Sequence, residues 1–198
     1  MDCKLSILIP STIDRKRMTD LLVENVQNQI NDLGVADQVE IIVDMDNKEV
    51  SIGFKRQRMH VKAKGEYVVS IDSDDAVMTD YLAEIWRGIE EQPDCITFEI
   101  SCSGTKGRRA NVSNNYPDWM DNIDGYDYVR TPYHKVPIRR EIALQIGFID
   151  LRYGEDYDFS NRLKKSGLIK TEYHICKPLY HYQYRNEPFR VKYGFNRK

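Results

Sequence analysis

The chain has 198 residues, of which 41% are hydrophobic and 30% charged, and 29 basic against 31 acidic residues give a formal net charge of −2. One globular domain of this length buries roughly 70% of the surface that its unfolded chain exposes, so its core needs neither disulfides nor a structural metal. The near-neutral balance argues against a dedicated nucleic-acid-binding protein, which depends on an excess of basic residues. No apolar run approaches the roughly 20 residues of a transmembrane helix and no signal-peptide pattern opens the chain, so we expect a cytoplasmic protein.

The first hundred residues alternate between predicted strands and helices. Short apolar runs predict strands at 4–10, 39–43 and 67–71, of which the first and the third are expected to be buried. Apolar residues three and four positions apart predict helices at 14–33, 52–64 and 79–91. In the first helix Asp14 is placed to cap the start, Leu21 belongs to the apolar set and Gly34 ends it, while Gly65 ends the second. This β-α-β-α-β-α order predicts an α/β fold, a mostly parallel sheet with helices on both faces.

The second half is less regular in sequence. A further strand is predicted at 95–101 and another at 173–184, and helices at 139–146 and 156–166 end at glycines. Residues 103–137 are rich in Gly, Asn, Asp and Tyr, and we expect a mobile segment that faces the substrate. The prediction is a single domain over 1–198, with a first half at 1–100, a second half at 101–184 and a basic tail at 185–198.

Carboxylates follow two of the predicted strands. Asp44 and Asp46 follow the second strand, and Asp72, Asp74 and Asp75 follow the third. Parallel sheets bind ligands beyond the carboxyl ends of their strands, so both groups fall on one rim. Carboxylates held together repel one another unless a cation is bound, and oxygen ligands suit Mg²⁺ or Mn²⁺. The alternative is an Asp-rich turn that caps the helix at 79–91.

A diphosphate is the ligand that such a metal would fit best. The divalent ion offsets charge on the leaving group, and basic side chains offset the remainder. Neither of the common glycine-rich phosphate-binding loops occurs in the chain. We therefore expect the metal, in place of backbone N–H groups, to bind the phosphates. The nearby basic residues at 55–64 either contact the anion or form a solvated helix face.

Four segments carry a resemblance to a known family. In chain order, KLSILIPSTIDR, VEIIVDMDN, GFKRQRMHVKAKGEYVVSIDSDD and GEDYDFSNRLKKSG resemble the family 2 glycosyltransferases of GT-A fold. The match covers roughly residues 4–170, and AKGEYVVSIDSDD is its most specific part. It implies an enzyme of the hexosyltransferase class that moves a sugar from a nucleotide-diphospho-sugar, such as a UDP-sugar, to an acceptor hydroxyl. It also implies inversion at the anomeric carbon and the use of Mn²⁺ or Mg²⁺.

The same resemblance implies the residues of the donor site. The positions that match nucleotide-sugar contacts are Pro10, Ser11, Thr12, Asp44, Asp46, Arg56 and Asp72. Met45 stands in place of the family's second acid, which leaves open whether Asp44 or Asp46 contacts the base. Asp74 is the first choice for the metal, with Asp72 beside it, and Asp75 caps or supports the turn.

The later segments match the acceptor side of the family. Asp156 in GEDYDF matches the general base, and Glu155 matches an acceptor-binding or orienting neighbour; alternatively, both cap the helix that follows. One carboxylate suffices for an inverting transfer, because the acceptor hydroxyl attacks in line and sheds one proton. His181 resembles a late metal or diphosphate ligand, or is structural. Lys135 matches a polar position that contacts phosphate or acceptor.

Two other functions stay open. The chain could be a non-catalytic module that binds a nucleotide-sugar, or a metal-dependent phosphohydrolase of the haloacid-dehalogenase type. Phosphohydrolases of that type carry the Asp-x-Asp motif at the end of the first strand, whereas here the motif follows the third predicted strand. The expected partners are the donor and a glycan, lipid-linked or protein acceptor, with no nucleic acid. The basic tail either approaches an anionic membrane surface or is a solvated end.

Overall fold

The computed structural model describes residues 2–103 and 109–183. The strands are β1 (Leu5–Thr12), β2 (Val39–Asp46), β3 (Tyr67–Ser70), β4 (Ala76–Val77), β5 (Cys95–Cys102), β6 (Arg109–Val112), β7 (Met120–Ile123), β8 (Tyr126–Arg130), β9 (Ile138–Arg139) and β10 (Glu172–Tyr182). The helices are the 3₁₀ turn η1 (Ile13–Arg15), α1 (Lys16–Leu33), α2 (Ile52–Lys62), α3 (Tyr81–Glu90), α4 (Arg140–Ile146) and α5 (Glu155–Ser166). The predicted basic tail at 185–198 and the last residue of the predicted strand at 173–184 lie outside the described residues.

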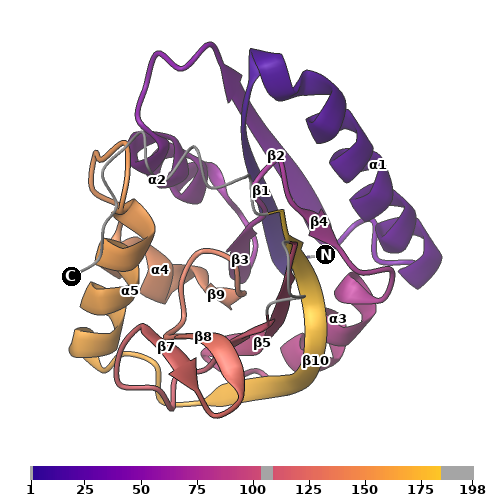
Figure 1. Cartoon of the computed structure of the whole chain (residues 1–198). Coiled ribbons are helices and arrows are strands. Elements are labelled where there is room, and N and C mark those ends of the chain that lie inside the picture. The colour runs from indigo at the N-terminus through magenta and orange to yellow at the C-terminus, as the bar shows by residue number, and fades with distance from the viewer. Residues whose placement is uncertain (1, 104–108, 184–198) are drawn as a thin grey trace.

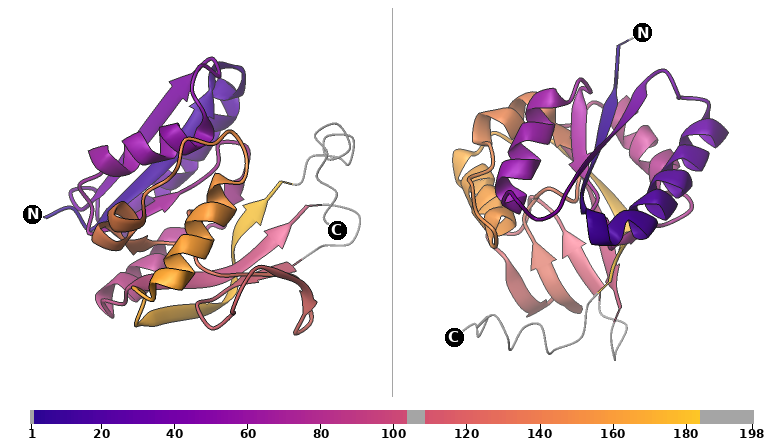
Figure 2. Two further views of the ribbon diagram at one scale, coloured as in Figure 1. Left: turned by 90° about the vertical axis from the view of Figure 1, so that its left-hand side faces the viewer. Right: turned by 90° about the horizontal axis from the view of Figure 1, so that it is seen from above.

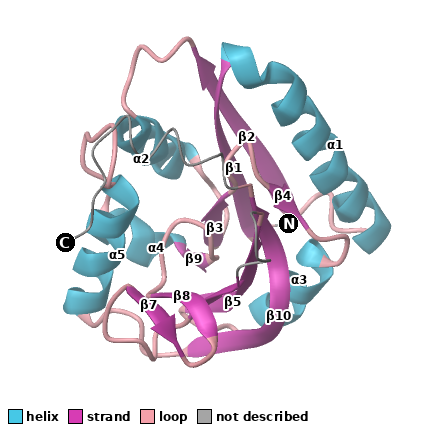
Figure 3. Cartoon of the chain, in the orientation of Figure 1, coloured by secondary structure: helices cyan, strands magenta, loops and turns pink. Residues whose placement is uncertain are grey.

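The strands form one mixed sheet in the order β2-β1-β3-β9-β5-β6-β8-β7, which β10 joins through β5 (Figure 3). Strands β2, β1 and β3 are parallel, as are β5 and β10, whereas β9 runs antiparallel to both β3 and β5. Helices α1 and α3 cover one face, and α2, α4 and α5 cover the other (Figures 1 and 2). The predicted α/β architecture with helices on both faces is confirmed.

Burial explains why the first strand is a continuous apolar run. Leu5, Ile7, Leu8 and Ile9 are all fully buried, because both faces of β1 are covered by helices. In α1 the buried apolar side chains are Leu22, Val26 and Ile30, spaced four apart, and Gly34 ends the helix at φ +71°. Leu21 is 58% exposed, so its predicted place on the apolar face is wrong.

Two predicted helix ends are also wrong. Asp14 lies within the η1 turn, and α1 begins two residues later at Lys16, so Asp14 does not cap it. The Asp14 carboxylate instead accepts hydrogen bonds from Thr12 Oγ1 and Lys48 Nζ. Helix α2 ends at Lys62, where the next residue turns to extended geometry, so Gly65 does not end it. A Cβ at Gly65 would lie 2.5 Å from the backbone nitrogen of Ser6, so close approach to β1 is what requires the glycine.

The segment at 103–137 contains strands that sequence periodicity did not indicate. Residues 109–130 form β6, β7 and β8 at one end of the sheet, where β6 pairs with β5 and β8 pairs with both β6 and β7. Its polar side chains are explained by this edge position, because one face of an antiparallel edge can remain in water. No helix within the described ranges is long and apolar enough to cross a membrane.

Candidate active site

A buried lysine ties the ends of β1 and β2 to α2. Lys55 Nζ donates to the carbonyl oxygen of Ser11 at 2.6 Å and pairs with the Asp46 carboxylate at 2.6 Å. The same carboxylate accepts the backbone N–H groups of Lys48 and Val50. Lys55 therefore does not belong to a solvated helix face, and the oxygens of Asp46 already have partners inside the protein.

The predicted nucleotide-contacting residues of β1 and β2 lie side by side. The parallel register places Pro10 opposite Asp44 and Thr12 opposite Asp46, so the residue pairs meet at one end of the sheet. Asp44 is bound by Arg58, whose Nε and Nη2 each donate to one of its oxygens, the latter at 2.5 Å. This two-point contact fixes the carboxylate and occupies both of its oxygens.

The acidic run after β3 folds around a buried lysine. Lys135 Nζ lies 3.0 Å from Asp72 Oδ2 and 2.5 Å from Asp75 Oδ2, and its side chain is almost completely buried. Tyr180 Oη donates to Asp75 at 2.6 Å, and the backbone N–H of Gln183 donates to the other oxygen of that carboxylate. Asp75 thus supports the turn, as one of the alternatives predicted. Lys135 contacts the protein's own carboxylates here.

Burial and neighbouring charges shift the pKa values of this cluster in different directions, so its groups differ in how readily they ionise. Burial raises the pKa of Asp72, but Lys135, Arg56 and His134 outweigh it and hold that pKa well below its usual range. At Asp75 burial prevails over Lys135, and the pKa is raised. Burial lowers the pKa of His134 to about 4, so this histidine is neutral at pH 7. Lys135 keeps its proton, because Asp72, Tyr180 and Asp75 together overcome the effect of burial and raise its pKa.

Arg56 joins the acidic turn to the start of α5. Its Nη2 donates to Asp72 Oδ1 at 2.7 Å, and its Nε donates to Glu155 Oε1 at 3.3 Å. Arg56 and Glu155 are both buried, and Arg56 Nη1 is buried without a hydrogen-bond partner in the protein. Burial raises the pKa of Glu155, and Arg56 lowers it by a smaller amount. Asp156, the next residue, is partly exposed and accepts the N–H of Tyr157 at 2.8 Å.

Asp74 is the third carboxylate of this turn. Its Oδ1 accepts a hydrogen bond from Arg15 at 3.1 Å, whereas Asp72 pairs through Oδ1 with Arg56 and through Oδ2 with Lys135, and both side chains are partly exposed. Within residues 2–103 and 109–183, no three His, Cys, Asp or Glu side chains converge to hold a metal by themselves. Mg²⁺ and Mn²⁺ often take one or two carboxylates and complete their shell with water and phosphate oxygens, so the residues present fit such an ion.

Among the described residues, the ion pairs of this cluster join four carboxylates to three permanent cations: Asp72, Asp74, Asp75 and Glu155 to Arg15, Arg56 and Lys135. The excess is one negative charge when all are ionised, and burial reduces it by raising the pKa of Asp75 and Glu155. A diphosphate bound beside the cluster would add negative charge, which a divalent cation would offset.

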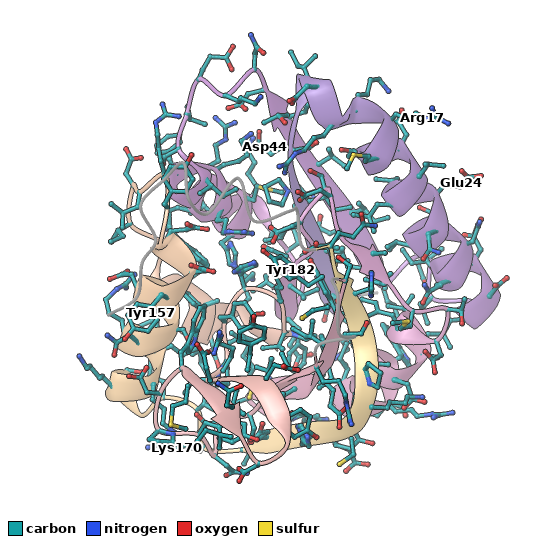
Figure 4. All side chains as sticks on the ribbon, in the orientation of Figure 1. Arg17, Glu24, Asp44, Tyr157, Lys170 and Tyr182 are labelled. Carbon is teal, nitrogen blue, oxygen red and sulfur yellow. The ribbon has the colours of Figure 1, made fainter. Side chains whose placement is uncertain are left out.

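His181 does not join this cluster. Its Nδ1 lies 2.8 Å from Ser101 Oγ, and it sits between Tyr180 and Tyr182 on β10, so its ring points to the opposite face of the strand. The ring centres of Tyr180 and Tyr182 each lie 4.5 Å from Lys135 Nζ. Figure 4 shows Tyr182 near the centre of the molecule in that view.

Sequence reasoning missed three residues of the cluster. Arg15 contacts Asp74, His134 Nε2 lies 3.4 Å from Asp72 Oδ2, and Tyr180 bonds Asp75. The segment RTPYHK gave no signal for His134, because the loop that carries it reaches the acidic turn only in the folded chain, where the backbone N–H of Ser70 donates to the carbonyl oxygen of His134. Arg15, at the end of η1, likewise approaches Asp74 only in the folded chain.

A separate surface pocket lies beside the start of α2. It has a volume of about 380 Å³ and is lined by Glu49, Val50, Ser51, Phe54, Asp150 and Arg152. None of these residues belongs to the charged cluster, so the pocket and the cluster are different features of the same end of the molecule.

Among the comparisons with known proteins, the one with solved structures shows the fold. No family model matches the sequence, and no curated protein matches it. Among solved structures, S. aureus TarS 1-349 in complex with UDP-GlcNAc superposes with a TM-score of 0.65 at 15% identity, over 92% of this chain and 59% of that one. The catalytic domain of Drosophila beta1,4galactosyltransferase 7 in complex with xylobiose superposes with a TM-score of 0.54 at 18% sequence identity. The match covers 86% of this chain and 64% of that one. The chain has the GT-A fold.

The GT-A fold limits the reactions but does not choose one. A putative glucose-1-phosphate thymidylyltransferase from Bacillus anthracis also resembles this chain, with a TM-score of 0.50 at 11% identity over 88% of it and 87% of that structure. This chain spans about 60% of the length of the TarS 1-349 structures. Because one fold hosts several chemistries, the reaction has to be argued from the site.

Proposed function

We propose that the protein is a metal-dependent, inverting glycosyltransferase that moves a sugar from a UDP-sugar to an acceptor hydroxyl. The observation that carries this proposal is the charged cluster that follows β1 and β3, bridged by Arg56 to the start of α5. The fold is that of S. aureus TarS 1-349, which has been crystallised in complex with UDP-GlcNAc and with UDP, and this likeness supports the choice of donor. Family 2 membership and a cytoplasmic location stay predictions.

The chain's own residues divide into two groups in this proposal. Asp74 would hold the divalent ion, with Asp72 as the neighbouring carboxylate that Arg56 and Lys135 keep ionised. The ion, when bound, supplies positive charge that stabilises the departing diphosphate. Pro10, Ser11, Thr12 and the Asp44–Asp46 segment, which line the adjoining strand ends, would contact the nucleotide.

The transfer step needs one proton acceptor. The acceptor oxygen bonds to the anomeric carbon from the side opposite the diphosphate, the carbon–oxygen bond to the diphosphate breaks, and the hydroxyl proton passes to Asp156. Asp156 suits this role because it is partly exposed, whereas Glu155 is buried against Arg56. Glu155 would orient the first turn of α5 through that contact.

Two variants test the proposal. With Mn²⁺ present, a UDP-sugar at 100 times its Kd should stabilise the wild type by about 2.7 kcal/mol, and Asp74→Ala should abolish this metal-dependent stabilisation. Asp156→Asn should leave donor binding unchanged and lower transfer about 10²- to 10⁴-fold. Asp158→Asn, on the same helix but paired with Arg162, is the matched control for the second variant.

The outcomes separate the alternatives. If donor binding is unaffected in Asp74→Ala, the metal is not held there. If Asp156→Asn transfers sugar at the wild-type rate, the base is another group, Glu155 first. A protein that binds the donor but neither transfers nor hydrolyses it in any form would be the non-catalytic module considered from sequence.

A further inference from the structure

Arg15 is far more exposed than Arg56 and Lys135, two other basic partners of the acidic turn. Its side chain is 32% exposed, whereas those of Arg56 and Lys135, which pair with Asp72, are 4% and 6% exposed. An exposed ion pair changes an equilibrium by about fivefold or less. Removal of one partner of a buried pair changes it by more than about a hundredfold, because the other charge is left without compensation. A competing cation can therefore replace Arg15 at Asp74 far more readily than it can replace either partner of Asp72.

The backbone of Arg15 is anchored, whereas its side chain is not. The carbonyl oxygen of Arg15 accepts a hydrogen bond from Thr19 Oγ1 at 3.1 Å, and the buried hydroxyl of Thr19 also meets that of Ser11. The side chains of η1 provide no such anchor, because none of the three residues in that turn is buried. A change of partner for the guanidinium therefore requires a rotation of the Arg15 side chain and no rearrangement of β1 or α1.

Arg15 lies between the two parts of the proposed donor site. It follows Thr12, the last residue of β1, by three positions, and its guanidinium reaches Asp74 in the turn after β3. Strands β1 and β3 are parallel neighbours in the sheet. In the proposed function the end of β1 contacts the nucleotide and Asp74 holds the ion, so the diphosphate that the ion binds lies within the span that Arg15 bridges. Arginine suits this ligand, because its planar guanidinium donates two parallel hydrogen bonds to phosphate oxygens.

We propose that a divalent ion bound at Asp74 displaces the guanidinium of Arg15, and that Arg15 then binds the diphosphate of the donor. This inference rests on the proposed function, because it takes Asp74 as the residue that holds the ion. An ion on either oxygen of Asp74 would lie close to the guanidinium, and the two positive charges would repel each other. The diphosphate supplies the negative charge that the guanidinium gives up when it leaves Asp74. Arg15 thus competes with the ion alone but contributes to binding of the donor.

Mn²⁺ and UDP, titrated separately into the full chain by calorimetry, test the inference. In Arg15→Gln, Mn²⁺ alone should bind about two- to tenfold more tightly, because the competing charge at Asp74 is gone. With saturating Mn²⁺ present, UDP should bind the same variant about tenfold more weakly, because a charge-assisted contact to phosphate is lost. The two changes have opposite signs, whereas a purely structural role of Arg15 would weaken both affinities.

Arg17→Gln is the matched control. It removes the same charge two residues away, from an exposed side chain on the outer side of α1 (Figure 4). At physiological salt it should change either affinity by less than about twofold, because exposed charges at longer range are screened. Arg15→Lys keeps the charge but not the planar fork, so its affinity for Mn²⁺ should stay near the wild type while UDP binds more weakly. Circular dichroism and melting temperature establish that each variant is folded, and Arg15→Lys carries the test if Arg15→Gln is not.

Three results would overturn the inference. The first is an affinity of Arg15→Gln for Mn²⁺ that equals the wild-type value or falls below it, since Arg15 would then not compete for Asp74. The second is equal affinity of Arg15→Gln and wild type for UDP in the presence of Mn²⁺. The third is a change in Arg17→Gln as large as that in Arg15→Gln, which would make the effect one of net charge.

The same titrations separate this inference from the proposed function. If Mn²⁺ binds the wild type and Asp74→Ala removes that binding, unchanged affinities in Arg15→Gln overturn the role of Arg15 alone. If Mn²⁺ does not bind the wild type, or binds Asp74→Ala equally well, the metal site of the proposed function fails and the role of Arg15 fails with it.

Discussion

Lys135 is the residue whose replacement tests the charged cluster most directly. Its ammonium group is the partner of Asp72 and Asp75, and it also contacts Tyr180 Oη at 3.2 Å. Lys135→Met keeps most of the side-chain volume but removes the charge from a site that is nearly closed to solvent. Removal of one partner of a buried ion pair costs about 3–5 kcal/mol, because the remaining charge is left without compensation.

This loss should depend on pH in a defined direction. Burial raises the pKa of Asp75, and Lys135 opposes that shift, so loss of the lysine raises the pKa further. A carboxyl group whose pKa is higher in the folded than in the unfolded state takes up a proton on folding. The variant should therefore recover stability relative to the wild type as the pH falls from 7 toward the unfolded value of about 4.

Urea denaturation followed by tryptophan fluorescence measures both effects. In a separate thermal melt at pH 7, the loss should lower the melting temperature by roughly 6 to 20 °C for a domain of this size. Asp75→Asn added to Lys135→Met should restore a large part of the stability, and Lys62→Met, an exposed site on α2, should change it by less than about 0.5 kcal/mol. A Lys135→Met loss below about 1 kcal/mol, or a loss independent of pH, would refute the buried ion cluster.

Three further predictions follow from buried charges and backbone geometry. Arg56→Gln should lower the free energy of unfolding by about 3 kcal/mol, and Glu155→Gln in the same chain should restore part of it, as urea titration would show. Burial lowers the pKa of His60 and His134 to about 4, below the unfolded value of about 6.5. Stability should therefore fall as the pH drops from about 7 to 4, by up to about 3 kcal/mol for each histidine, and their replacement by Gln should flatten that slope. Gly34→Ala should cost about 1 kcal/mol by thermal melting, since only the φ of +71° opposes a side chain there.

The parallel part of the fold was predictable because its signals are local. Continuous apolar runs at β1, β2 and β3 and four-residue spacing in α1 each depend on neighbours in the chain. The strands β6, β7 and β8 were not predictable from sequence, because their polar segments form strands only by pairing with β5 and with one another. Local pattern does not record such pairing.

The candidate site divides in the same way. The apolar runs were enough to place Asp44, Asp46 and the carboxylates at 72–75 at the ends of parallel strands, and therefore at one end of the sheet. Which base pairs with which carboxylate became known from the folded chain alone: Lys55 is a buried partner of Asp46, and Lys135 lies between Asp72 and Asp75. The physical reason is that strand order fixes where backbone ends lie, whereas the charge state of a buried group depends on side chains from distant segments.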